Sequence, residues 1–290
     1  MEVSDTPSPT VQRRRLRAEL RRARLDAGLT QEQVATAMDW SLSKLIRIEN
    51  GTTAGISTND LKAILLHYRI TDGVRTTELL ALAKTSRERS WWSTYGDSVP
   101  KRLIQLIDYE AAASTARSFE SFVVAGPLQT ADYARAAIHQ LAPQMEDSEV
   151  SVRVEIRTKR QELLRRPDAP RMFFTMDESV VRRVVGGQDV MRGQLQRMIE
   201  VADMPNVTIE VVPFRAGVLS GMQAPFVIYE FPDAADDDVL YQEIPSGDLL
   251  SRDDPEEVLT FREYFERLRE ASLGPEGTID FLREVLGELG

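Results

Sequence analysis

Residues 31–51, QEQVATAMDWSLSKLIRIENG, decide the fold of the first part of this 290-residue chain. Their apolar residues recur at helical spacing on either side of a polar break, which predicts helices at 31–38 and 42–50. Thr30 and Ser41 immediately precede the two helices, where a hydroxyl group can accept a hydrogen bond from the first turn. The stretch therefore predicts two short helices joined by a tight turn.

Further helices are predicted on both sides of this pair, at residues 12–27, 60–68 and 75–84. In the first of them, Leu16 and Leu20 recur at helical spacing, and Gly28 follows where a helix commonly ends. The sequence thus predicts an all-α domain of five short helices over residues 12–88. Residues 1–11 are polar and are expected to form a disordered tail.

Charge is distributed unevenly along the chain. The net charge is −10, but residues 1–90 carry 15 Lys/Arg and 11 Asp/Glu, whereas residues 91–290 carry 21 and 35. Seven arginines lie between Arg13 and Arg24. A basic N-terminal part favours contact with DNA, and an acidic remainder repels it. On charge alone, a solvated basic helix face explains the arginines equally well.

The segment from Gln31 to Gly51 resembles the Cro/repressor (XRE-type) helix-turn-helix, with the correct spacing of helix, turn and helix. The resemblance implies a DNA-binding domain whose second helix enters the major groove. Ala35 is small, as the close crossing of the two helices requires. Asp39 occupies a position commonly held by glycine, and aspartate tolerates the left-handed backbone conformation better than most residues.

Residues opposite the buried face of the second helix are the candidate base readers, and they are Leu42, Ser43, Lys44 and Arg47. Arg47 can donate two hydrogen bonds to a guanine, which is the commonest specific contact. Leu42 offers only apolar contact, for example to a thymine methyl group. Plain solvent exposure is the alternative interpretation of Lys44 and Arg47.

The candidate phosphate contacts come from the same helices and from the basic first helix, and they are Thr30, Gln31, Asn50, Arg14, Arg15 and Arg22. Gln31 resembles the glutamine that bonds a phosphate in this family. The resemblance also implies that Arg24 and Glu49 pair with each other inside the domain. Both are therefore expected to be structural and not to contact DNA.

Residues 91–290 predict an acidic α+β domain with a mixed or antiparallel sheet. Helices are expected at residues 100–113, 131–140, 148–166, 190–202, 255–271 and 275–289. Strands are expected at residues 118–124, 171–176, 206–213, 225–231 and 239–244, the last two as a hairpin.

Motifs of this second part include PLQTADYA at 127–134, RQELL at 160–164 and PNVT at 205–208. On these and similar motifs, residues 91–286 resemble a domain that follows the same helix-turn-helix in actinomycete regulators of the WhiJ-type, antitoxin-like family. Genes for such regulators commonly neighbour one for a small partner protein. One departure is visible, because residues 125–128 are AGPL where PGLL is usual.

The inventory of reactive side chains argues against an enzyme. The chain has no cysteine and two histidines, which excludes thiolate chemistry and leaves too few ligands for a His-rich metal site. Asp177 and Glu178 are adjacent at the end of a strand, so one of them is expected to cap the following helix. We expect no catalytic residue, no metal and no cofactor.

Two kinds of binding partner remain open for the acidic domain: a small protein encoded by a neighbouring gene, or a small effector. Aromatic residues such as Phe119 and Phe174 could line a pocket or fill the core. The alternative function is that of an antitoxin, which acts mainly by binding its protein partner and regulates its own gene by binding DNA. An enzymatic domain is less favoured. We expect a cytoplasmic, homodimeric transcriptional regulator on a palindromic operator, with no membrane segment.

Overall fold

The computed structural model describes residues 9–50, 56–87, 91–95, 99–232, 237–243, 249–252 and 254–289. The chain divides into two compact units. The N-terminal unit consists mainly of Met1–Thr94, and the C-terminal unit consists of Tyr95–Phe231 and Asp237–Gly290. Within the described residues, no helix is long and apolar enough to cross a membrane.

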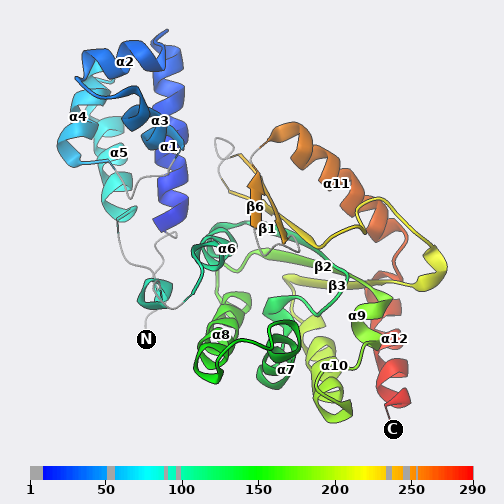
Figure 1. The fold of residues 1–290 in the computed structure, drawn as a ribbon. Helices are drawn as coiled ribbons and strands as arrows, with labels where there is room; N and C mark the ends of the chain where they lie inside the picture. The colour runs from blue at the N-terminus through cyan, green and yellow to red at the C-terminus, as the bar shows by residue number, and fades with distance from the viewer. Residues whose placement is uncertain are drawn as a thin grey trace. The chain divides into compact units, whose positions relative to one another are not determined.

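The described part of the N-terminal unit contains five α-helices (Figure 1). They are α1 (Pro9–Asp26), α2 (Gln31–Ala37), α3 (Leu42–Asn50), α4 (Thr58–His67) and α5 (Gly73–Thr85), and a short 3-10 helix, η1 (Trp91–Tyr95), follows them. Leu20 of α1, Leu45 of α3, and Leu61 and Ile64 of α4 are buried in one apolar core. The predicted all-α domain of five short helices is confirmed.

Local hydrogen bonds fix the beginnings of α2, α3 and α4. Thr30 Oγ1 accepts a hydrogen bond from the Gln33 backbone N–H (3.2 Å), and Gln33 Oε1 accepts one from the Thr30 backbone N–H (2.9 Å), which is a complete capping box. Ser41 and Ser57 each accept a hydrogen bond from the backbone N–H three residues further on. The N-caps predicted at Thr30 and Ser41 are confirmed, and Ser57 caps α4.

Helix α1 begins at Pro9, three residues before the predicted start at Gln12. Proline is favourable in the first turn because its fixed φ suits the helix. It also lacks a backbone N–H, and an N–H in the first turn would have no partner within the helix. Residues 1–8 of the predicted tail lie outside the described residues. At the other end, Gly28 follows the helix with φ +67°, which is the left-handed conformation expected at this stop position.

The C-terminal unit is built on a six-stranded sheet with the order β3-β2-β1-β4-β5-β6. The strands are β1 (Thr115–Glu120), β2 (Arg171–Asp177), β3 (Val207–Val212), β4 (Phe226–Glu230), β5 (Val239–Glu243) and β6 (Leu249–Arg252). Strands β1, β2 and β3 are parallel to one another, whereas β4, β5 and β6 pair antiparallel with their neighbours. The predicted α+β fold is confirmed, and the sheet is mixed.

Helices cover both faces of this sheet (Figure 1). They are α6 (Lys101–Ala112), α7 (Ala131–Leu141), α8 (Asp147–Arg160), α9 (Glu178–Arg182), α10 (Gln188–Ala202), α11 (Pro255–Glu270) and α12 (Gly274–Glu288), with 3-10 helices η2 (Gly126–Leu128), η3 (Gln161–Arg165) and η4 (Phe214–Ala216). Phe119, Phe226 and Phe265 form the core between the sheet and α11. Helices α6, α7, α8 and α10 lie on the opposite side (Figure 1).

The strand predicted at 118–124 is displaced, because β1 spans Thr115–Glu120. Backbone groups beyond Glu120 are bonded to side chains instead of a neighbouring strand. The Val124 N–H donates a hydrogen bond to Tyr133 Oη (3.1 Å), and the Val124 carbonyl accepts one from Gln129 Nε2 (2.6 Å). The end of the predicted strand is therefore a loop held by the side chains of Gln129, which follows η2, and Tyr133 of α7.

Other boundaries differ from the sequence-based expectation. The helix predicted at 148–166 ends at Arg160, and the chain then tightens into η3, where the Gln161 side chain donates a hydrogen bond to the Gln129 carbonyl. Strand β6 was not predicted, since four residues are too few to show the alternation of a strand.

The outer edge of β3 is covered by the beginning of α12. The Val211 N–H donates a hydrogen bond to Thr278 Oγ1 (3.0 Å), and the Val211 carbonyl accepts one from the Leu273 N–H (2.9 Å). Thr278 is fully buried. Backbone groups that would otherwise be unpaired at a sheet edge are thus satisfied by α12 and the residue before it.

Candidate nucleic-acid interface

Helix α3 has one buried and one exposed face. Leu45 and Ile48 are buried (0% and 7% exposed) and face the core, on the side where α3 packs against α2. Leu42, Ser43 and Arg47 are exposed on the other side. Three of the four predicted base readers therefore lie at the surface, toward the end of the helix that enters the major groove in helix-turn-helix proteins.

The turn between α2 and α3 depends on Asp39. Its φ is +54°, in the left-handed region that non-glycine residues seldom adopt, and this agrees with the expectation from the sequence. Backbone hydrogen bonds hold the turn, since the Asp39 N–H donates to the Thr36 carbonyl (3.2 Å) and the Trp40 N–H donates to the Ala35 carbonyl (2.8 Å). Helix α3 is thereby fixed in direction relative to α2.

Arg24 of α1 and Glu49 of α3 form a buried bidentate ion pair. The Arg24 Nε–Glu49 Oε1 distance is 2.7 Å and the Nη2–Oε2 distance is 3.0 Å, and the two residues are 7% and 5% exposed. Arg24 Nη1 also donates a hydrogen bond to the Leu29 carbonyl (2.9 Å). Hydrogen bonding to Glu49 raises the pKa of Arg24 above its ordinary value. This pair connects the end of α3 to α1.

Two more side chains converge on Glu49. Gln31 Nε2 donates a hydrogen bond to Glu49 Oε2 (2.7 Å), and Arg17 Nε donates one to the Glu49 carbonyl (3.1 Å). The sequence predicts a phosphate contact for Gln31 and gives no sign of its bond to Glu49. Burial, and then the Glu49 carboxylate, raise the pKa of Tyr68, so its phenol is neutral at physiological pH.

Lys44 differs from the other predicted base readers because it already has partners within the unit. Its Nζ lies 3.2 Å from Asp60 Oδ2 of α4 and 3.9 Å from the centre of the Trp40 ring. Both side chains of the ion pair are about one-third exposed. Such a pair contributes roughly 0–1 kcal/mol, so a phosphate or a base can compete for Lys44.

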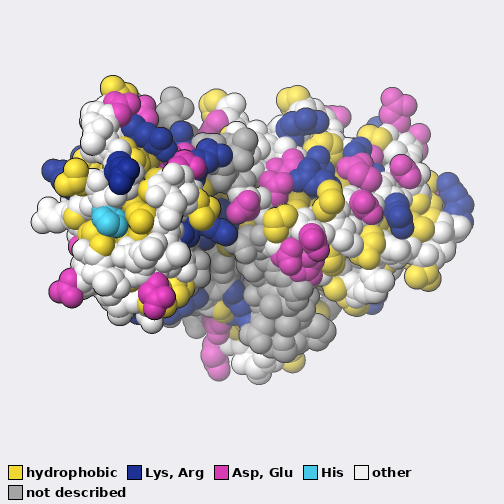
Figure 2. All heavy atoms as spheres, turned by 90° about the horizontal axis from the view of Figure 1, so that it is seen from above, with side chains coloured by type: hydrophobic (Ala, Val, Ile, Leu, Met, Phe, Trp, Pro, Cys, Tyr) yellow, Lys and Arg dark blue, Asp and Glu magenta, His cyan; other side chains and the backbone are white. Residues whose placement is uncertain are grey.

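Arg47 is exposed, and no ion pair holds its guanidinium group within the described part of the chain. Among the predicted phosphate contacts, Thr30, Arg15 and Arg22 are exposed, whereas Arg14 is half-buried. The side chain of Asn50 lies outside the described residues. On the face shown in Figure 2, acidic and basic side chains of the C-terminal unit are interspersed, so its negative charge forms no single patch on that face.

Comparisons with known families add to this geometry. Residues 15–79 match a family model described as a helix-turn-helix domain. Residues 103–284, more than half of the chain, match a model described as a domain of unknown function (DUF5753). The chain belongs to the DUF5753 family. No curated protein and no solved structure matches the chain. The helix-turn-helix match indicates a DNA-binding regulator.

Several motifs of the DUF5753 domain have structural roles. Asp177 caps α9, because its Oδ1 accepts a hydrogen bond from the Ser179 N–H (2.9 Å), and this confirms the expectation for the Asp177–Glu178 pair. The departure at residues 125–128 corresponds to η2. A side chain at Gly126 would bring a Cβ atom to 3.3 Å from Arg160 Nη1. Within the described residues, no cluster of His, Cys, Asp and Glu could hold a metal ion.

Proposed function

We propose that this chain is a sequence-specific transcriptional regulator that places α3 in the major groove of its operator. The observation that carries the proposal is the pair of faces of α3, in which Leu45 and Ile48 are buried while Leu42, Ser43 and Arg47 are exposed. The Arg24–Glu49 ion pair supports it, because it anchors the far end of α3 to α1. The helix-turn-helix match supports it independently.

The proposed regulator acts as a homodimer on a palindromic operator. One helix-turn-helix offers a small interface to DNA, and dimers that bind two half-sites about one helical turn apart are a common solution. The DUF5753 domain would supply the dimer contact. Sedimentation of the full chain with an operator duplex tests this point: two chains per duplex are expected, and one chain per duplex contradicts the dimer.

The proposed role of the DUF5753 domain is to bind a small partner protein or a small effector and so to regulate operator binding. An antitoxin that acts mainly by neutralising a protein partner is the alternative. Genome-wide mapping of bound sites, with and without the neighbouring gene, distinguishes the two. A regulator occupies its sites upstream of several genes, whereas an autoregulating antitoxin is expected at its own promoter alone.

Replacement of Arg47 by alanine is expected to weaken binding to the specific operator by about 1–3 kcal/mol and to relax the base preference at one position. The reason is that a guanidinium group donates two hydrogen bonds to a guanine, and alanine donates none. The measurement is fluorescence anisotropy of the full chain on the operator and on operators with single substitutions.

Lys84→Ala is the matched control for Arg47→Ala, because it removes one exposed positive charge from α5. It is expected to leave base preference unchanged. If Arg47→Ala weakens binding to the operator and to random DNA equally, Arg47 contacts a phosphate and the assignment as base reader is wrong.

Replacement of Arg15 or Arg22 by alanine is expected to weaken binding to all DNA sequences alike. Each lost phosphate contact should reduce the slope of log K against log salt by about 0.9 on B-form DNA, since fewer counterions are released. Titrations at several salt concentrations measure the slope. An unchanged slope in both variants would remove these arginines of α1 from the interface.

A further inference from the structure

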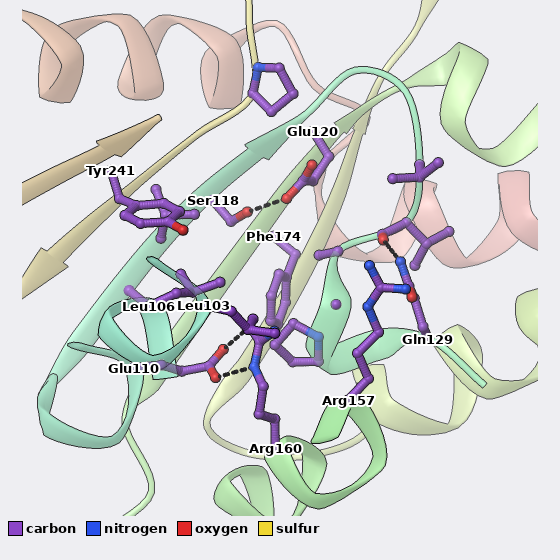
Figure 3. Close-up of a pocket in the computed structure, with 18 of the residues that line it drawn as sticks. Leu103, Leu106, Glu110, Ser118, Glu120, Gln129, Arg157, Arg160, Phe174 and Tyr241 are labelled. Carbon is purple, nitrogen blue, oxygen red and sulfur yellow. Dashed lines mark hydrogen bonds and ion pairs between the residues drawn. The ribbon is translucent and has the colours of Figure 1, made fainter. Parts of the chain in front are cut away.

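The DUF5753 domain contains a cavity of about 210 Å³ between the sheet and helices α6 and α8 (Figure 3). Its volume is below the roughly 300–1,000 Å³ typical of sites for drug-sized ligands, so any occupant must be small. Leu103 and Leu106 of α6 line one side, and Arg157 of α8 points in from another (Figure 3).

The floor of the cavity is a row of side chains across four neighbouring strands. Ser118 of β1 is in register with Phe174 of β2 and with Val227 of β4, and Val227 is in register with Tyr241 of β5. All four residues line the cavity. Because residues in register point to the same face of a sheet, they form a continuous, largely apolar and aromatic platform.

Positive charge prevails in the walls. Four arginines line the cavity against two glutamates, Glu110 and Glu120. Glu110 is engaged by Arg160 through two hydrogen bonds of 2.7 and 3.0 Å, and both residues are buried. Arg153 and Arg157 are one helical turn apart on α8, and Arg102 adds a further charge from α6. The cavity is therefore suited to an anion.

Gln129 Oε1 and Arg153 Nε, both from residues of the lining, lack a hydrogen-bond partner within the described part of the chain. Gln129 is 2% exposed, and its Nε2 is held by the Val124 carbonyl (2.6 Å), so its orientation is fixed and its oxygen cannot turn to solvent. Arg153 is held through Nη2 by Glu149 (2.8 Å). A buried acceptor and a buried donor without partners cost free energy, which a ligand that bonds both would recover.

We propose that this cavity binds a small organic anion whose carboxylate or phosphate group is bonded by Arg153 and Arg157. The apolar body of the anion lies on the platform of Phe174, Val227 and Tyr241, and a donor group on it meets Gln129 Oε1. The inference deepens the effector role within the proposed function and names its ligand class. It is tested without DNA, so its failure and that of the operator-binding proposal are distinguishable.

The test is isothermal titration calorimetry of the full chain with 4-hydroxybenzoate, 4-hydroxyphenyl phosphate and 4-hydroxybenzamide. These probes share an aromatic body and a donor hydroxyl group, and the benzamide lacks the charge. We expect at least one of the two anions to bind saturably, with an affinity about tenfold or more higher than that of the benzamide. The reason is that charge-assisted hydrogen bonds are stronger than neutral ones. The preferred anion distinguishes a carboxylate site from a phosphate site.

Arg157→Gln and Arg153→Gln are expected to weaken binding of the preferred anion by about tenfold to a hundredfold each. The matched control is Arg283→Gln on α12, which removes an exposed arginine of the same domain and should change affinity less than about twofold. Circular dichroism establishes that the variants are folded.

Three outcomes would overturn the proposal. In the first, neither anion binds saturably at about 10 mM, which leaves only water in the cavity. In the second, the benzamide binds as tightly as the anions, which shows an uncharged site. In the third, both folded α8 variants bind the preferred anion as the unmodified chain does, which places the anion elsewhere.

Discussion

Arg160→Met is expected to lower the free energy of unfolding of the DUF5753 domain by about 3–5 kcal/mol, because it leaves a buried carboxylate without its partner. Arg160 and Glu110 are 8% and 2% exposed, and their ion pair joins α8 to α6 across 50 residues of sequence. Arg160 is the ion-pair partner of Glu110, and the neighbouring Tyr229 phenol stays neutral because burial, and then the Glu110 carboxylate, raise its pKa well above the ordinary value. Urea denaturation of the full chain followed by far-UV circular dichroism measures the loss.

The double variant Arg160→Met/Glu110→Leu is the control for this prediction. It replaces the pair by apolar side chains of similar length, and such replacements of buried pairs are often neutral. Most of the lost stability should therefore return. If the double variant is less stable than the single one, the destabilisation comes from lost packing of the long side chains and not from the unpaired charge.

Arg24→Met is expected to destabilise the helix-turn-helix unit by about 3 kcal/mol and to abolish specific DNA binding at 37 °C. Loss of one partner of a buried ion pair costs about 3–5 kcal/mol. We expect the lower value here because Gln31 still donates a hydrogen bond to Glu49 (2.7 Å) after the change. The far end of α3 then loses its ion pair with α1 and keeps the hydrogen bond from Arg17 Nε to the Glu49 carbonyl (3.1 Å). Hydrogen exchange of the full chain should show faster exchange at amides of α1 and α3, with the strands of the DUF5753 sheet unaffected.

Arg22→Met, two residues away on the exposed face of α1, is the matched control. Surface substitutions of this kind change stability by less than about 0.5 kcal/mol. Arg22→Met should therefore retain the exchange pattern of the unmodified chain and lose only nonspecific affinity. Equal exchange rates in Arg24→Met and Arg22→Met would show that the Arg24–Glu49 pair does not hold α3 in place.

The helix-turn-helix could be predicted from the sequence because its signals are local. Thr30 and Ser41 cap helices that begin one residue later, and Gly28 and Asp39 adopt positive φ within turns of a few residues. The apolar spacing of α3 places Leu45 in the core by itself. Local signals of this kind need no knowledge of the tertiary fold.

Contacts between distant residues could not be predicted in the same way. Nothing in the pattern of α3 indicates that Lys44 reaches Asp60, 16 residues away, or that Gln31 bonds Glu49. The candidate anion site is a stronger case, because its floor depends on the register of four strands and its unpartnered acceptor depends on the orientation of Gln129. The residues that line the site are scattered along the sequence and follow no regular spacing.

The hydrogen bonds at Val211 have a consequence for how copies of this protein can assemble. An exposed strand edge is a template on which another chain can add a strand, and that route leads to open-ended aggregates as readily as to dimers. Here Thr278 and Leu273 occupy both backbone groups of Val211, so a second strand cannot pair along β3 without displacing the beginning of α12. Addition of a strand at Val211 is therefore opposed, and the proposed homodimer would use other surfaces of the chain.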